Sequence, residues 1–242
     1  MDDKKLSHLK TTARTLRKHI ITMNCMAGTG HPGGSLSSAD IIAYLFEYEL
    51  NFSPDNAKDK NRDRFILSKG HACPALYAVL AHKGFFEVSA FKTLRQVNGM
   101  LEGHPDRLKT PGVECNTGSL GQGLSFSLGV ALGGKRKKQN FRVYTIVGDG
   151  ELNEGQCWEA FMFGSHYHLD NITVVVDYNK IQSDDFCDNV TSLEPLHDKL
   201  KAFGWHVIEI HGHDFIQIES AFDRAKKIKG IPTIIIAHTI KG

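Results

Sequence analysis

The sequence lacks an apolar run long enough to cross a membrane, and it lacks the apolar core of a secretion signal. No eighteen consecutive apolar residues occur in the 242-residue chain, and the first five residues, Met-Asp-Asp-Lys-Lys, are polar. We therefore expect neither a membrane-spanning protein nor a secreted one.

A strong excess of charge of one sign is also lacking. Lys and Arg number 29 against 27 Asp and Glu, which gives a formal net charge of +2. This balance argues against a broad basic surface for nucleic acids or anionic membranes. The one dense basic run, residues 135–138, follows an apolar helical pattern, and we expect it in solvent at a helix carboxyl end, where cations are favoured.

Cysteine is sparse and scattered. The five cysteines are odd in number and contain no Cys-x-x-Cys pair, so they predict neither a disulfide framework nor a zinc site but reduced thiols in the cytoplasm. The sequence also has no internal repeat and no low-complexity linker, and we predict a single domain over residues 1–242.

Helical and strand patterns alternate along the chain. Short apolar, β-branched runs typical of buried parallel strands occur at 64–68, 143–147, 172–176, 206–210 and 233–237. Helical patterns occupy 6–25, 119–138, 154–168, 196–203 and 216–229; further helices are expected from an N-cap at Ser37 or Ser38 to Glu49, and from near Pro74. This alternation predicts an α/β fold, a doubly wound parallel sheet with helices on both faces.

Two oxygen-bearing side chains follow two of these strands directly. Asp149, in Gly148-Asp149-Gly150, comes after one strand, and Asn179 comes after the next. Ligands of open α/β sheets bind at the carboxyl ends of the strands, and Mg²⁺ there takes one or two protein carboxylates and leaves positions for phosphate oxygens. A Gly-Asp-Gly alone is usually an ordinary turn. The preceding strand and Asn179 favour a cation site that binds a diphosphate, with the backbone carbonyl of Ile181 as a third ligand.

Five motifs give the chain a resemblance to a known family. They are Gly-His-Pro-Gly-Gly (30–34), Ser-Lys-Gly-His-Ala (68–72), Gly-His-Pro-Asp (103–106), Gly-Val-Glu-Cys-Asn-Thr-Gly-Ser-Leu-Gly-Gln-Gly (112–123) and Gly-Asp-Gly-x-x-x-Glu-Gly (148–155). In this order they resemble the amino-terminal, thiamine diphosphate-binding domain of transketolases, over essentially the whole chain.

The resemblance implies a set of cofactor contacts. Asp149, Asn179 and the Ile181 carbonyl would hold Mg²⁺ or Ca²⁺, and Asn179 would also contact the cofactor. The Gly150 amide and His71 would face the diphosphate, since an absent side chain allows close approach of an anion. Backbone groups of a second segment would meet the aminopyrimidine ring: Gly118, Ser119 and Leu120. Many relatives carry proline at the position of Ser119, so this turn is expected to be looser here.

The resemblance also implies catalytic positions. His31, His71 and His104 would line the active site, and an imidazole that titrates near neutral pH suits proton movement on sugar oxygens. Glu154 corresponds to a glutamate near the subunit boundary, which couples to the partner's cofactor-activating carboxylate.

Transketolases build their site from two domains, and the second one is not recognisable here. We therefore expect the amino-terminal subunit of a split transketolase, joined to a carboxyl-terminal, pyrimidine-binding subunit in two copies of each, and moving a two-carbon ketol unit from a ketose phosphate to an aldose. A fragment of a longer chain is the other explanation. The sequence leaves open the sugar, including sulfonate in place of phosphate. Alternatives are a deoxyxylulose phosphate synthase-like or oxo-acid dehydrogenase-like component, and a cofactor-binding regulatory subunit or diphosphate-binding module without turnover.

Overall fold

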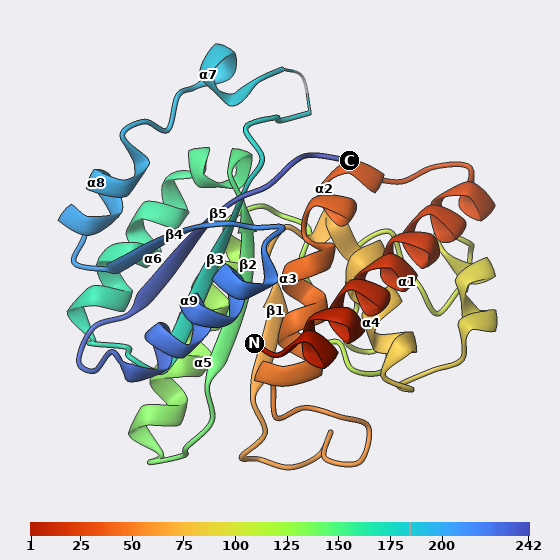
Figure 1. Cartoon of the computed structure of the whole chain (residues 1–242), viewed down its shortest axis with the longest axis horizontal. Helices are drawn as coiled ribbons and strands as arrows, with labels where there is room; N and C mark the ends of the chain where they lie inside the picture. The colour runs from red at the N-terminus through yellow and green to blue at the C-terminus, as the bar shows by residue number, and fades with distance from the viewer. Residues whose placement is uncertain (184) are drawn as a thin grey trace.

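A five-stranded parallel sheet forms the centre of the molecule. The computed structural model describes residues 1–183 and 185–242. The strand order is β1-β2-β3-β5-β4, and every neighbouring pair is parallel (Figure 1). The strands are β1 (Arg64–Leu67), β2 (Val143–Gly148), β3 (Ile172–Tyr178), β4 (His206–His211) and β5 (Thr233–His238). The five predicted strands are confirmed, with bounds that differ by at most two residues.

Helices cover both faces of this sheet and enclose two separate cores. One core contains residues of α1 (Asp3–Ala27), α3 (Ala39–Tyr44), α4 (Cys73–His82) and α9 (Phe215–Lys227). The other contains residues of α5 (Gln122–Arg136), α6 (Gly155–His166) and α8 (Leu196–Ala202). Alternate strand residues enter opposite cores: Ile146 and Val175 belong to the first, Val147 and Val174 to the second. The predicted doubly wound fold is confirmed.

A short helix that the sequence did not predict precedes the second predicted helix. Helix α2 (Pro32–Ser37) starts at a proline, which fits a first helical turn because no hydrogen bond is lost there. The predicted N-cap is confirmed at Ser38, which directly precedes α3 and the helical turn through Glu49, although its side chain makes no capping hydrogen bond. Ser38 lies between α2 and α3, at φ −90° and ψ 0°, and the helix continues after Tyr44 as a π-helical turn, Leu45–Glu49.

Several short elements had no signal in the sequence. They are the 3₁₀ segments Gly70–Ala72, Val88–Thr93 and Gly150–Asn153, and helix α7 (Cys187–Val190). Two residues separate Gly70–Ala72 from the end of β1, and Gly150–Asn153 begins directly after Asp149, so both shape the end of the sheet where the site was expected.

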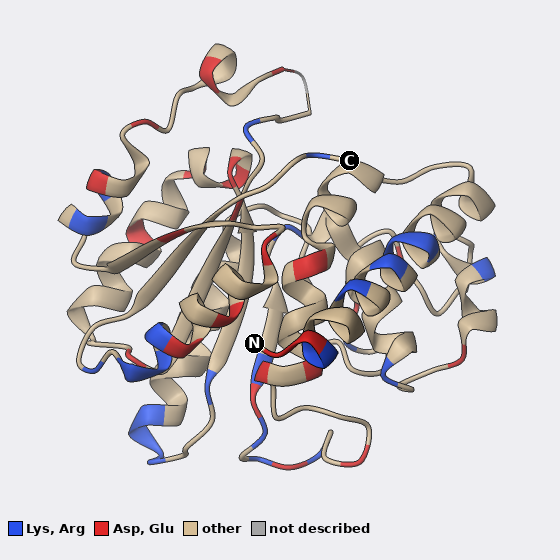
Figure 2. Cartoon of the chain, viewed as in Figure 1, with Lys and Arg blue, Asp and Glu red and all other residues tan. Residues whose placement is uncertain are grey.

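Charged side chains of both signs are spread over the molecule, with basic side chains gathered in two places (Figure 2). Lys and Arg occur along α1, where no acidic residue follows Asp3, and at the end of α5, a helix without Asp or Glu (Figure 2). Lys135 at the end of α5 pairs with Asp170, 2.7 Å away. None of the helices in residues 1–183 and 185–242 has the length and apolarity needed to cross a bilayer.

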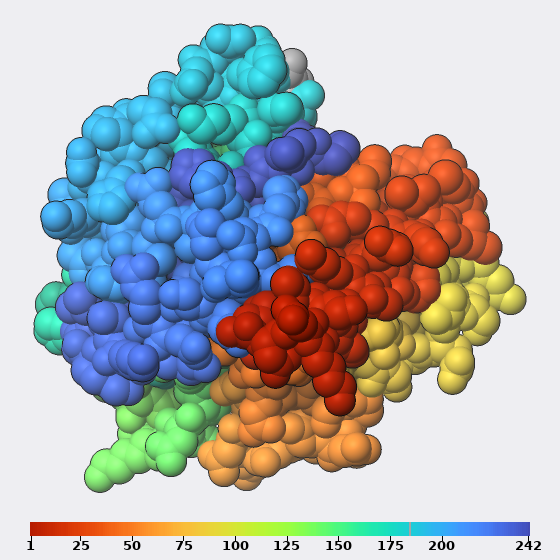
Figure 3. Space-filling model, viewed as in Figure 1, coloured from red at the N-terminus to blue at the C-terminus, as the bar shows by residue number. Residues whose placement is uncertain are grey.

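The last residues of the chain cross from the sheet to the amino-terminal helices. After β5 the chain passes over the sheet end and reaches α2, where the Gly242 amide donates to the Gly33 carbonyl, 3.3 Å away. In Figure 3 this segment lies between the surface of the carboxyl-terminal third and that of the first helices. It therefore forms one wall of the region described next.

Candidate functional site

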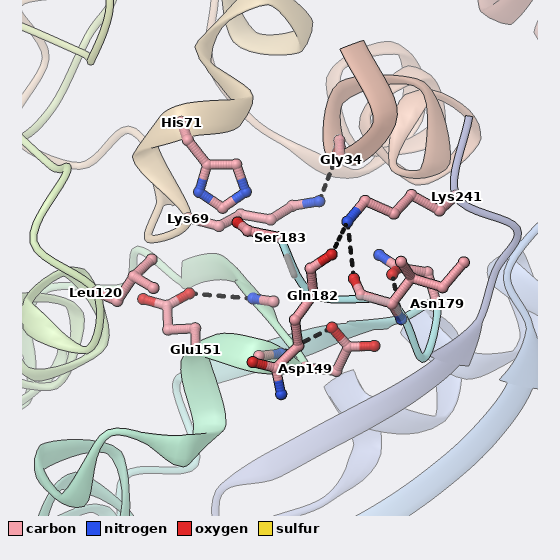
Figure 4. Close-up of a pocket in the computed structure, with 13 residues that line it drawn as sticks. Gly34, Lys69, His71, Leu120, Asp149, Glu151, Asn179, Gln182, Ser183 and Lys241 are labelled. Carbon is pink, nitrogen blue, oxygen red and sulfur yellow. Dashed lines mark hydrogen bonds between the residues drawn. The ribbon is translucent and has the colours of Figure 1, made fainter. Parts of the chain in front are cut away.

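A cavity of about 190 Å³ lies at the carboxyl ends of β1, β2 and β3. Its wall combines residues that follow these strands with residues from α2, from the turn before α5, and from the end of the chain (Figure 4). The lining residues are Gly34, Lys69, His71, Leu120, Gly148, Asp149, Gly150, Glu151, Asn179, Ile181, Gln182, Ser183 and Lys241. Six residues predicted from the sequence are among them: His71, Leu120, Asp149, Gly150, Asn179 and Ile181.

The Asp149 carboxylate joins the ends of β2 and β3. It is 2 % exposed, and its oxygens accept hydrogen bonds from the Gly150 amide at 2.7 Å and the Lys180 amide at 2.5 Å. Burial raises the pKa of Asp149, while these two amides oppose the rise. Because the Lys180 amide lies between Asn179 and Ile181 in the chain, Asp149 is held against the turn that carries the other two predicted ligands.

The Asn179 side chain is oriented by its neighbours. Its Nδ2 donates to Asp177 at 3.1 Å, and its Oδ1 accepts from the Ile181 amide at 3.1 Å. The nitrogen side of the amide is thereby fixed, and Oδ1 keeps lone-pair capacity for another partner. Asp149, Asn179 and the Ile181 carbonyl together form an oxygen donor set with one carboxylate, which suits Mg²⁺. No group of three or more His, Cys, Asp or Glu side chains within the described residues is arranged to hold a metal ion.

A lysine ammonium group already contacts this donor set. Lys241 Nζ donates to the Ile181 carbonyl at 2.9 Å and to the Gln182 carbonyl at 2.8 Å (Figure 4). The charged group at the Ile181 carbonyl, which the sequence analysis assigned to the metal, is therefore the Lys241 ammonium. Similarly, the Gly150 amide, predicted to meet a phosphate oxygen, is here bonded to Asp149. Both groups would have to exchange or share partners when a ligand binds.

A buried ion pair ties the strand ends together behind the cavity. Lys69 is 1 % exposed and Asp177 fully buried, with Lys69 Nζ 2.5 Å from Asp177 and 2.6 Å from the Gly34 carbonyl. Asp177 also accepts hydrogen bonds from Ser37 and Thr239. Burial alone would raise the pKa of Asp177, but Lys69 and these donors hold it below its ordinary value. Asp177 thus connects β1, α2, β3 and the end of β5.

Glu151 makes a second internal connection. Its carboxylate accepts from Ser68 Oγ at 2.5 Å, the Gly121 amide at 2.8 Å and the Gly148 amide at 3.0 Å. Burial raises the pKa of Glu151, and the three donors oppose this. The side chain therefore fixes the turn after β2 to the turn before α5.

Three histidines gather beside the cavity. The rings of His31 and His71 are 5.5 Å apart, and a Cβ placed on Gly118 would lie 3.1 Å from the His104 ring. Partial loss of hydration lowers the pKa of all three, to about 4 for the more deeply placed His71, where the nearby charges of Lys69, His31 and His104 add to the effect. The neutral imidazole is thus the favoured form at neutral pH. His31 and His104 are exposed and do not line the cavity itself.

The segment predicted to meet the aminopyrimidine ring lies against the histidine turn. A Cβ on Gly70 would be 2.7 Å from the Gly118 amide, so the two backbones approach closely, and Gly118 itself has a φ of 155° that favours glycine. Leu120 lines the cavity, whereas Gly118 and the exposed Ser119 lie outside its wall.

Glu154 lies apart from the other predicted residues. It is exposed, directly precedes α6 and does not line the cavity. Its Cβ lies 3.3 Å from the place of a Cβ on Gly121, so it is close to the residue that follows Leu120.

Sequence reasoning missed three charged side chains that line the cavity, Lys69, Glu151 and Lys241. The sequence contained a signal for each of them. Lys69 lies in the motif 68–72 and Glu151 in the motif 148–155, and Lys241 follows the end of β5 closely, as Asp149 follows β2. The rule that ligands meet the carboxyl ends of parallel strands would have included Lys241.

Comparison with known proteins gives matches over nearly the whole chain. The family described as transketolase, thiamine diphosphate-binding domain, matches residues 8–242. The 6-deoxy-6-sulfo-D-fructose transketolase subunit of Clostridium sp. (strain MSTE9) is 44% identical over 234 residues, which are 97% of this chain and 85% of that protein. An apulose-4-phosphate transketolase subunit of Phocaeicola vulgatus is 38% identical over 226 residues, 93% of this chain and 80% of that protein.

A solved structure agrees in fold. The transketolase of Campylobacter jejuni superposes with a TM-score of 0.90 at 35% identity, over 96% of this chain but only 37% of the other. The chain therefore spans little more than a third of that full-length transketolase, and most of the length of the two subunit-type relatives.

Proposed function

Because the chain belongs to the family of transketolase thiamine diphosphate-binding domains, we propose that it is the amino-terminal subunit of a split transketolase. Together with a carboxyl-terminal partner it would transfer a two-carbon ketol unit from a ketose to an aldose. The strongest support in the chain itself is one arrangement: the carboxylate of Asp149 is held by a backbone amide against the turn that presents Asn179 and the Ile181 carbonyl to a cavity.

In this proposal Asp149, Asn179 and the Ile181 carbonyl would hold Mg²⁺ or Ca²⁺, which would in turn supply the positive charge that binds the cofactor's diphosphate. The chemistry of the donors fits a hard cation, since only one of the three carries charge and positions remain for phosphate oxygens. Lys241 supplies positive charge at the cavity wall, and the Gly150 amide would supply a donor once it is released from Asp149. When bound, the thiazolium ring of thiamine diphosphate supplies the electron sink for breaking the carbon–carbon bond.

The residues around the cavity have distinct tasks in this proposal. The turn 118–120 would hold the aminopyrimidine ring through backbone groups, and His71 would face the diphosphate. His31 and His104 hydrogen-bond the substrate's oxygens and move protons on and off them, for which their neutral forms are the competent bases. Glu154, at the start of α6, couples this site to the partner subunit.

The partner is proposed to supply the remaining half of the site, in an assembly with two copies of each chain located in the cytoplasm. The substrate is a ketose with an anionic terminus. The name of one relative contains a sulfonated sugar and that of another a sugar phosphate. Both groups are anions with three oxygens, so we propose that the choice between them is made largely by basic residues of the partner.

Reconstitution tests this function directly. The purified chain is mixed with the carboxyl-terminal transketolase subunit from the same organism, and two-carbon transfer is measured with fructose 6-phosphate and with 6-deoxy-6-sulfofructose as donors. We expect transfer only when both chains, thiamine diphosphate and Mg²⁺ are present, and a loss of at least about a hundredfold in Asp149→Ala, since catalysis depends on the cation.

Two results would contradict the proposal. One is a mixture that binds the cofactor but transfers a two-carbon unit from neither fructose 6-phosphate nor 6-deoxy-6-sulfofructose. The other is consumption of pyruvate, which would indicate a synthase-like or dehydrogenase-like component instead.

A further inference from the structure

The segment after β5 is held at several points before it reaches the cavity. The Thr239 amide donates to the Tyr178 carbonyl at 3.2 Å, the Ile240 amide to His213 Nε2 at 2.9 Å, and the Gly242 amide to the Gly33 carbonyl at 3.3 Å. Between the last two points the Lys241 side chain extends to the carbonyls of Ile181 and Gln182 (Figure 4). The course of this backbone therefore determines where the Lys241 ammonium group lies.

The contact with His213 joins a side chain to the backbone just before Lys241. His213 belongs to the loop between β4 and α9, and it does not line the cavity. Since the Ile240 amide can only donate, Nε2 of His213 must be the acceptor. The ring proton then lies on Nδ1, which is 2.7 Å from Asp40 Oδ2 and donates to it.

Asp40 is in turn fixed by a second partner. It is 6 % exposed, and Arg17 of α1 binds both of its oxygens, at 2.9 Å and 2.5 Å. The pKa of Asp40 is lowered in spite of its burial, because of its hydrogen bonds to His213 and Arg17. A continuous chain of partners thus runs from α1 through Asp40 and His213 to the backbone beside Lys241, and each link leaves the next a single favourable orientation.

We propose that His213 is a positioning residue of the cavity: by accepting the Ile240 amide it fixes the backbone next to Lys241, so that the Lys241 ammonium group stays at the cavity wall, where an anionic ligand can meet it. This inference rests on the proposed function of the cavity as a diphosphate site. A pre-positioned cation increases affinity because less side-chain and backbone freedom is lost on binding. His213 acts only through Lys241 and touches no ligand.

Two substitutions of His213 separate the two contacts of its ring. In His213→Asn the amide nitrogen can replace Nδ1 at Asp40, but no atom reaches the Ile240 amide. In His213→Gln the longer side chain brings an oxygen to the place of Nε2 and restores that acceptor. We expect binding of magnesium pyrophosphate to the whole chain, measured by calorimetry, to weaken about tenfold in His213→Asn and about twofold in His213→Gln.

A double-mutant cycle shows whether the effect passes through Lys241. Lys241→Met removes the charge and should weaken magnesium pyrophosphate binding by tenfold or more. If His213 acts through this residue, adding His213→Asn to Lys241→Met produces little further loss, because the two changes are coupled. A role of His213 in general stability would instead give additive losses, and thermal melting of each variant measures stability separately.

The possible outcomes decide different questions. Wild-type chain that binds no magnesium pyrophosphate would overturn the proposed function of the cavity. Wild-type binding with an unchanged or tighter constant in His213→Asn, or additive losses in the double variant, would overturn the role of His213 alone. Equal losses in His213→Asn and His213→Gln would also contradict it, since only one of the two lacks the acceptor.

Discussion

Individual side chains at the cavity have protonation states that depend on burial. His71 is the clearest case, since burial and nearby cations lower its pKa from 6.5 to about 4. Between these two values the unfolded chain binds a proton that the folded chain does not bind. The free energy of unfolding therefore decreases as the pH falls from about 7 to about 4.

This predicts a specific pH effect of His71→Gln. As the pH falls from about 7 to about 4, the free energy of unfolding of the variant should decrease by roughly 1–3 kcal/mol less than that of the wild type. The variant lacks the partly buried imidazole that resists protonation. Urea unfolding at several pH values measures it. His211→Gln, at an exposed position, is the control and should keep the wild-type pH dependence; an unchanged dependence in His71→Gln would argue against a depressed pKa.

The buried pair of Lys69 and Asp177 gives a second prediction at this scale. Asp177→Asn leaves the Lys69 ammonium group buried without a counter-charge and should lower the free energy of unfolding by about 3–5 kcal/mol. Adding Lys69→Met should recover part of this loss, since the uncompensated charge is then removed. Chemical denaturation measures these free energies of unfolding. The control is Asp170→Asn at the partly exposed pair with Lys135, which should lower the free energy of unfolding by at most about 1 kcal/mol. A small effect of Asp177→Asn would mean that Lys69 finds another partner.

At the scale of elements, the start of α5 is fitted closely against the end of β1. A Cβ on Gly123 would lie 2.7 Å from both Cα and Oγ of Ser68, whereas a Cβ on Gly129 of the same helix would meet nothing within 4 Å. In α5, Gly123 therefore permits the close approach of the helix to Ser68, whereas Gly129 has no neighbour that requires a glycine.

Two alanine substitutions test this contrast. Gly123→Ala should destabilise the chain by about 1–3 kcal/mol through displacement of α5. It should also weaken cofactor binding, because Ser68 is bonded to Glu151. Gly129→Ala should stabilise the chain by about 0.5–1 kcal/mol, as alanine does in a helix interior. Thermal melts of the two variants should shift in opposite directions, and a shift of the same sign would contradict the packing.

The elements differ in how far the sequence could predict them. The parallel strands are buried on both faces, so they appear as continuous apolar runs, and their positions were readable. Helix α2 could not be predicted, because Gly33 and Gly34 favour a loop. In the structure Pro32 begins this helix, and Gly34 packs near His71. The contacts of Glu151 with Ser68 and Gly121 join residues at least 30 positions apart, as do those of Lys241 with Ile181 and Gln182. No local pattern encodes these contacts or the strand order.

At the scale of the whole molecule, the cavity lies between segments from every part of the chain, from Gly34 to Lys241. A ligand that binds there should stabilise the folded state as a whole. At a concentration 100 times its dissociation constant it adds about 2.7 kcal/mol to the free energy of unfolding.

We therefore expect thiamine diphosphate with Mg²⁺ to raise the melting temperature of the whole chain by roughly 5–10 °C. Removal of the metal with a chelator should abolish the shift, and Asp149→Ala should show none. A full shift without divalent cation, or in the variant, would mean that the cation is not held by Asp149.

The Glu151 carboxylate accepts hydrogen bonds from the Gly121 and Gly148 amides at the same time. The turn proposed to hold the ring and the turn proposed to hold the phosphates are thereby kept at a set separation. Analogues of the cofactor with a longer or shorter tether between these two groups could satisfy either turn but not both. The chain should therefore discriminate among them by length, before any substrate is present.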